Sequence, residues 1–296
     1  MEKTGMKSKT IKSILSKKIT EWTNSITDDQ LKRKVRENVI VTGGAITSML
    51  MGEEVNDYDV YFRDHDTTLL ISKYYLDLFK SKTNAGKKMT ITDFEGRIKI
   101  VIASDGVAED KAAIRTTPTG IEEAHEESEQ IALTKEDEKD KPKFQPVFLT
   151  SNAITLTGKV QIVIRFYGEP DVIHENYDFA HCTNYWQGWD GQLILRPIAL
   201  ETILSKTLLY QGSKYPICSL IRTRKFIERG WKINAGQFLK MAMQISKLNL
   251  EDMSVLEDQL TGVDTAYFNQ LITALKENNK DVVDASYLVE IVDRIF

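Results

Sequence analysis

Residues 41–62 read VTGGAITSMLMGEEVNDYDVYF, and this segment contains the most specific local pattern in the chain. A short apolar strand is predicted to end at the glycine pair Gly43-Gly44. A helix of a few residues is expected to follow, with Gly52 as its stop signal. A second strand is expected over residues 55–62. The pattern therefore predicts a strand, a glycine turn, a helix and a second strand in close succession.

The second strand carries two carboxylates at alternate positions, Asp57 and Asp59. Because side chains alternate along a strand, both carboxylates are expected on one face. Paired carboxylates repel each other and attract divalent cations, so we interpret them as ligands of Mg²⁺ (or Mn²⁺). The glycine turn and the free N–H groups of the helix start suit a phosphate. The candidate nucleotide-binding residues in this turn and helix are Gly43, Gly44, Thr47 and Ser48.

This segment resembles the signature of the DNA-polymerase-β-like nucleotidyltransferase superfamily, a glycine pair followed at a distance by Asp-x-Asp. Within that superfamily it is most similar to the head of tRNA CCA-adding enzymes and bacterial poly(A) polymerases. The matching positions are Gly43, Gly44, Ala45, Leu50, Gly52, Asp57 and Asp59. The family's Arg-Asp pair is replaced here by Thr47-Ser48. Weaker resemblances occur in residues 149–154 and in residues 221–226, which are similar to the family's neck helix.

The resemblance implies a metal-dependent nucleotidyltransferase in which Asp57 and Asp59 are catalytic. Such an enzyme adds a nucleotide from an NTP to an RNA (tRNA-like) 3′ hydroxyl and releases pyrophosphate. We expect addition without a template, because no template-binding module is recognisable, and we expect a viral or phage member. The family's base-selecting Glu-Asp-x-x-Arg is absent, and Tyr215, Pro216 and Ser219 occupy that region. The choice of nucleotide is therefore left open.

Two other classes of function remain alternatives. The same metal site would serve for nucleotidylation of a protein or a small molecule, which needs no nucleic-acid channel. The fold could also belong to a catalytically silent binding protein.

A third carboxylate usually completes such a site, and Asp178 is our candidate. It follows a strand predicted over residues 160–167 and opens another predicted over residues 178–184. Glu95 and Asp105 are alternatives, since they lie near the start and the end of a strand predicted over residues 97–103. We assign Asp178 both a catalytic and a metal-binding role.

The formal net charge of −4 hides a strong segregation of charge. Residues 206–247 contain nine basic residues and one acidic residue, whereas residues 109–143 contain eleven acidic and six basic residues. A basic segment attracts polyanions regardless of the net charge. Arg222, Lys225 and Arg229 share one face of a predicted helix. We therefore interpret Arg222 and Lys225 as contacts to the base or phosphates of the nucleotide.

The length of 296 residues suits two domains, and no stretch is long and apolar enough to cross a membrane. Two cysteines exclude a disulfide framework and indicate a cytoplasmic protein. A zinc site is disfavoured because the spacing of the candidate ligands matches no standard pattern. These candidates are His174, His181, Cys182 and Cys218, of which His181 and Cys182 are interpreted as packing residues of a strand.

The fold class expected is α+β, with a mixed-sheet nucleotidyltransferase head followed by an all-α C-terminal domain. We expect a basic N-terminal helix in residues 1–24, a catalytic domain in residues 25–196 and a helical domain in residues 197–296. Residues 104–142 are expected to form an acidic insertion. Helical structure is expected over residues 1–37, with Asp28 as a cap before Leu31 and Val35, and over residues 67–80. Further strands are expected over residues 147–150 and 154–156.

Overall fold

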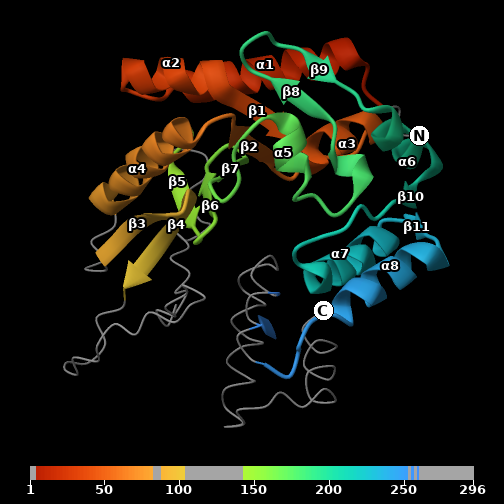
Figure 1. Cartoon of the computed structure of the whole chain (residues 1–296). Coiled ribbons are helices and arrows are strands. Elements are labelled where there is room, and N and C mark those ends of the chain that lie inside the picture. The colour runs from red at the N-terminus through yellow and green to blue at the C-terminus, as the bar shows by residue number, and fades with distance from the viewer. Residues whose placement is uncertain (1–4, 83–87, 104–142, 253–254, 257–258, 260–296) are drawn as a thin grey trace.

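The computed structural model describes residues 5–82, 88–103, 143–252, 255–256 and 259. Its centre is a seven-stranded sheet in the order β5-β6-β7-β2-β1-β8-β9 (Figure 1). The strands are β1 (Val39–Thr42), β2 (Tyr58–Phe62), β5 (Pro146–Leu149), β6 (Ala153–Leu156), β7 (Val160–Val163), β8 (Tyr185–Gln187) and β9 (Leu193–Ile194). Strands β2 and β7 pair in parallel, and the other neighbouring pairs of this sheet are antiparallel. The mixed sheet predicted for the head is confirmed.

The N-terminal helical segment consists of α1 (Ser8–Asn24) and α2 (Asp29–Asn38), and the predicted cap at Asp28 is confirmed. The Asp28 carboxylate accepts hydrogen bonds from the N–H groups of Gln30 and Leu31, and so caps the N-terminus of α2. Helix α1 packs into the core of the sheet through buried apolar side chains. These are Ile11, Leu15, Ile19 and Trp22.

A separate hairpin of β3 (Lys88–Phe94) and β4 (Arg97–Ala103) follows α4 (His65–Lys82). The predicted helix over 67–80 and the predicted strand over 97–103 are thus confirmed, whereas β3 was not predicted. The expected acidic insertion, residues 104–142, and the alternative carboxylate Asp105 lie outside the described residues.

The strand predicted over residues 178–184 is wrong. The short helix α5 (Pro170–His174) precedes this segment, and a single turn of 3-10 helix, η2 (Ala180–Cys182), occupies its middle. Phe179 instead contributes to a second core beneath the helical part of the chain, and its backbone makes only an isolated bridge to Tyr210. The alternating apolar residues that resembled a strand therefore pack between the head and the helical part of the chain.

The C-terminal described part contains α6 (Pro197–Ser205), α7 (Pro216–Glu228) and α8 (Ala235–Ile245). Helices α7 and α8 lie side by side, away from the large sheet (Figure 1). Two short parallel strands, β10 (Thr207–Leu208) and β11 (Lys232–Ile233), interrupt the helices, so the expectation of an all-helical segment is wrong there. With helices segregated from a mixed sheet, the fold class is α+β as predicted. Among the described residues, no helix is long and apolar enough to span a membrane.

Candidate functional site

The glycine turn after β1 is shaped by Gly43, which has φ 91° and ψ −154°. This backbone conformation is essentially restricted to glycine. A Cβ at Gly43 would also lie 2.6 Å from Asp59 Oδ2 and 3.5 Å from the Tyr177 hydroxyl. Gly43 therefore satisfies two requirements at once, an unusual backbone turn and the close approach of a carboxylate.

Helix α3 (Gly44–Met51) begins directly after this turn, as predicted, and ends at Gly52 in the left-handed conformation. Gly44 is exposed, and a Cβ placed on it would meet nothing within 4 Å. The N-terminus of α3 is therefore accessible beside Asp59. Free N–H groups of a helix start favour anions such as phosphate.

Asp59 lies on β2 directly opposite Thr42 of β1, and Asp57 lies just before β2 begins. Burial and the neighbouring Asp57 raise the pKa of Asp59 to about 7, while Arg222 opposes the shift. Burial also raises the pKa of Asp57, which Lys159 partly counteracts. Within the described residues, no hydrogen bond or ion pair reaches the Asp59 carboxylate. The half-buried Asp59 thus lacks a partner for its negative charge.

A divalent cation fits this pair of carboxylates. It would offset the burial of Asp59 and the repulsion from Asp57, and it prefers oxygen ligands. In the part of the chain that the structure describes, no group of three His, Cys, Asp or Glu residues could hold a metal ion. A cation held by Asp57 and Asp59 would therefore have no third carboxylate from Asp178, Glu95 or another described acid in this conformation.

Asp178 is buried and faces α7 of the helical part. Its Oδ2 atom accepts a hydrogen bond of 2.6 Å from Arg222 Nη1, so the two side chains form an ion pair. Farther along α7, Arg229 Nη2 forms an ion pair of 2.6 Å with Glu53, just after α3. Arg222 and Arg229 therefore join α7 to the head, while Lys225 lies exposed on the same helix.

The two hydroxyl residues of α3, Thr47 and Ser48, are both buried. Thr47 is buried, and its hydroxyl donates a 2.7 Å hydrogen bond to the carbonyl oxygen of His181. Ser48 is also buried, and its carbonyl accepts the N–H of Glu53. Gly43 is buried, and its N–H donates a 3.1 Å hydrogen bond to the carbonyl oxygen of Cys182. The accessible part of the turn is therefore the backbone at Gly44.

The sequence of this chain matches a known family. A family model described as "Gabija anti-defense 2 family protein" matches residues 13–206. The chain belongs to the Gabija anti-defense 2 family. The "Gabija anti-defense 2" protein of Bacillus phage SPbetaL7 is 21% identical over 261 residues, which cover 88% of this chain and 49% of that protein. The chain thus spans about half the length of this relative, whose source agrees with the expected phage origin.

Solved structures with similar folds include CCA-adding enzymes. The Thermotoga maritima CCA-adding enzyme complexed with tRNA is 10% identical and has a TM-score of 0.40, covering 88% of this chain and 56% of that one. A CCA-adding enzyme in complex with ATP is 12% identical and has a TM-score of 0.40, covering 95% of this chain and 68% of that one.

The family chain also contains site residues that its sequence did not reveal. His174 Nε2 lies 2.8 Å from Thr42 Oγ1, which bonds the Asn184 carbonyl and so anchors the end of β1. The hydroxyl of Tyr177 lies near Gly43 and interacts with that of Tyr61 beneath the Asp59 carboxylate. His174 and Tyr177 are far in sequence from Thr42 and Tyr61, so no local signal could have shown these contacts.

The suggested zinc ligands do not form a site among the described residues. His181 is buried between the rings of Phe226, at 4.6 Å, and Trp231, at 4.3 Å. Burial lowers its pKa to about 4, so the imidazole is neutral at physiological pH. Cys218 is buried and donates to the carbonyl of Gln259. The interpretation of His181 as a packing residue is confirmed, although it lies in a 3-10 turn.

Proposed function

We propose that this chain is a metal-dependent nucleotidyltransferase that adds a nucleotide from an NTP to the 3′ hydroxyl of an RNA. The observation that carries the proposal is the position of Asp59. Among the described residues its carboxylate has no hydrogen-bond or ion-pair partner, and it lies against the glycine turn and is repelled by the charge of Asp57. A phosphate-accepting helix start and a cation-accepting acidic pair are thus adjacent, as nucleotidyl transfer requires.

The chemistry is an in-line displacement at the α-phosphorus. The acceptor oxygen forms a bond to this phosphorus, and the bond from the phosphorus to the oxygen bridging to the β-phosphate breaks, so pyrophosphate leaves. The acceptor loses its hydroxyl proton, for which Asp178 is our candidate base. Asp57 and Asp59 would hold Mg²⁺ (or Mn²⁺), which supplies positive charge to the phosphate oxygens when bound. The exposed backbone at Gly44 would position the triphosphate at the start of α3, where Gly43 leaves room beside Asp59.

The basic surface of the helical part supports a polyanionic acceptor. Arg222 and Arg229 are engaged in ion pairs with the head, so they do not provide this surface in the present conformation. Exposed lysines remain on and between the helices. They are Lys214, Lys225, Lys232, Lys240 and Lys247. Such a surface favours RNA through its backbone phosphates and predicts binding that weakens steeply with salt.

Membership of the Gabija anti-defense 2 family suggests what the reaction serves. We propose that nucleotidyl transfer is the means by which the chain counteracts the defence for which the family is named. Phage infection of cells that carry this defence tests the link, with the wild-type chain and the double variant Asp57→Ala/Asp59→Ala compared. The wild-type chain is expected to protect the phage from the defence, and the double variant, at equal protein level, is expected to give no such protection.

The activity itself is tested with purified protein, Mg²⁺, each α-³²P-labelled NTP and total cellular RNA. Label in RNA that disappears in Asp57→Ala/Asp59→Ala, but persists in the exposed control Asp77→Ala on α4, is the expected result. Label found only in protein would instead establish nucleotidylation of a protein. Absence of incorporation by the folded wild-type protein into RNA or protein would favour a catalytically silent binding protein.

A further inference from the structure

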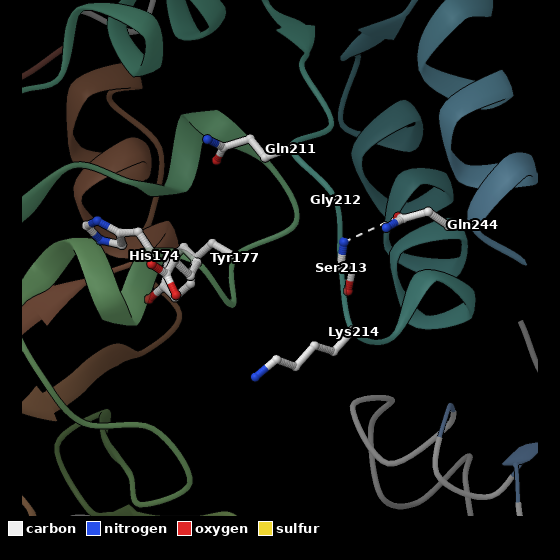
Figure 2. Close-up of a pocket in the computed structure, with 8 residues that line it drawn as sticks. His174, Tyr177, Gln211, Gly212, Ser213, Lys214 and Gln244 are labelled. Atoms are coloured by element: carbon white, nitrogen blue, oxygen red, sulfur yellow. Dashed lines mark hydrogen bonds between the residues drawn. The ribbon is translucent and has the colours of Figure 1, made fainter. Parts of the chain in front are cut away.

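A pocket of about 410 Å³ lies between α5 of the head and the linker that leads into α7 (Figure 2). This volume is within the range of small-molecule sites, roughly 300–1,000 Å³. His174, Glu175 and Tyr177 line it from the head, and Gln211, Gly212, Ser213, Lys214 and Gln244 line it from the helical part. In Figure 2, Lys214 extends from the linker toward the side on which His174 and Tyr177 lie.

Tyr177 connects this pocket to the acidic pair. Its hydroxyl lies 3.5 Å from the point where a Cβ on Gly43 would stand, and Asp59 Oδ2 lies 2.6 Å from the same point. On the opposite wall, the N–H of Gln211 bonds the carbonyl of Asp178 at 2.8 Å. A ligand whose phosphates lie at the exposed start of α3, next to Gly43, would therefore have Tyr177 between its phosphates and the pocket.

The pocket presents both donors and acceptors. Gln211 is exposed, so its amide oxygen and nitrogen can both serve a ligand. The Gln244 side-chain oxygen is already used by the Tyr210 hydroxyl and the N–H of Ser213, which leaves its amide nitrogen as a donor near Gly212. Mixed donors and acceptors match the hydrogen-bonding edge of a nucleobase.

The charge of the pocket argues against phosphate as its occupant. Glu175 contributes one negative charge and Lys214 one positive charge. His174 is neutral because burial lowers its pKa to about 3. A site without net positive charge offers no general attraction to phosphate, whereas a neutral polar heterocycle can bond both Glu175 and Lys214.

We infer that this pocket binds the base of the incoming nucleotide, and that Gln211 and Lys214 determine which base is accepted. The inference rests on the proposed function, since it concerns the nucleotide whose phosphates would lie at the start of α3, next to Gly43. Tyr177 provides an aromatic surface beside the base, and amide and ammonium groups bond its edge. This assignment gives the chain a means of base selection although it lacks the Glu-Asp-x-x-Arg sequence.

Isothermal titration calorimetry of the full chain tests the assignment. The titrants are the Mg²⁺ complexes of the non-hydrolysable α,β-methylene analogues of ATP, CTP, GTP and UTP, together with Mg²⁺-tripolyphosphate. The variants are Gln211→Ala and Lys214→Ala. The side chains of Gln211 and Lys214 make no hydrogen bond among the described residues. Gln192→Ala and Lys73→Ala are matched controls on exposed positions outside the pocket.

We expect the wild type to prefer one base, and we expect each pocket variant to bind that analogue about three- to ten-fold more weakly. Tripolyphosphate affinity should be unchanged in these variants, and the controls should match the wild type. If the wild type binds nucleotide but the pocket variants keep both affinity and preference, the pocket assignment alone is wrong. If the wild type binds neither nucleotide nor tripolyphosphate, the proposed function fails and the assignment fails with it.

Discussion

Asp59 Oδ2 lies 2.6 Å from the point at which a Cβ on Gly43 would stand, so the glycine turn and the carboxylate fit together only without a side chain at position 43. The contact joins the end of β1 to the middle of β2 across the pair Thr42 and Asp59. A single atom added at this point would therefore disturb both the phosphate-accepting turn and the acidic pair.

Gly43→Ala is expected to reduce nucleotidyl transfer by about 100-fold, because reacting groups displaced by roughly 1 Å lose about this much rate. The positive φ should also lower the free energy of unfolding by about 1–2 kcal/mol. Gly236→Ala on α8, where a Cβ meets nothing within 4 Å, is the control for both readouts. Wild-type activity in Gly43→Ala would contradict the placement of the site at this turn.

Mg²⁺ is expected to raise the thermal unfolding temperature of the wild type, because it binds Asp57 and Asp59 only when the fold brings them together. Asp59→Asn should abolish this stabilisation, since the amide cannot supply the negative charge. Differential scanning fluorimetry with and without Mg²⁺ measures the effect, and Asp77→Asn serves as the control. An unchanged Mg²⁺ response in Asp59→Asn would remove this carboxylate from the metal site.

Acid is expected to destabilise the chain through His174. Burial lowers the pKa of this imidazole to about 3 in the folded chain, from a value near 6.5 in the unfolded chain. The unfolded state therefore binds a proton first, and stability is lost as the pH falls from about 6.5 toward 3, at about 1 kcal/mol per pH unit. Urea unfolding at several pH values should show a smaller slope for His174→Asn. Equal slopes for the two proteins would refute a buried neutral His174.

The ion pair between Arg222 and Asp178 is expected to couple α7 to the head. A double-mutant cycle with Arg222→Gln and Asp178→Asn should give a coupling of about 1–2 kcal/mol in the free energy of unfolding. This coupling is smaller than that of a fully buried ion pair, because the Arg222 side chain is 43% exposed. The pair Arg224 and Glu228, which is exposed, is the control and should couple by less than about 0.5 kcal/mol. Additive effects at Arg222 and Asp178 would exclude the coupling.

Thr47 is expected to matter for stability rather than for the nucleotide. Thr47→Val leaves the carbonyl of His181 without its donor and should lower the free energy of unfolding by about 1–3 kcal/mol. Thr47→Ser keeps the hydroxyl and should recover most of this loss. The KM for the NTP should stay within about two-fold of wild type in both variants, and a selective rise of KM in Thr47→Val would instead support a direct nucleotide contact.

The first half of the site could be predicted because it is local. The strand, the glycine turn, the start of α3 and the pair Asp57 and Asp59 all lie within one short segment, where backbone preferences and alternation determine the structure. The end of α3 at Gly52 and the cap of α2 at Asp28 are local in the same sense.

The second half depends on contacts that no local pattern encodes. The alternation around Phe179 and His181 resembles a strand, but these rings pack against Phe226 and Trp231 of the helical part. The helical spacing of Arg222, Lys225 and Arg229 predicts a basic helix face. It could not show that Asp178 forms an ion pair with Arg222. Strands of two residues, such as β10 and β11, are also too short to produce a recognisable period.

The order of the strands in the large sheet has a consequence for how the chain reaches its folded state. Strand β1 pairs with β8, and the bond between Thr42 and His174 joins positions 132 residues apart. Closing such a long loop is slow, because its entropy must be lost before the contact forms. During synthesis, the ribosome therefore releases the glycine turn and both carboxylates long before the strand that completes their surroundings. The site is assembled late, and a nascent chain that stops short of β8 contains its acidic pair without the architecture that positions it.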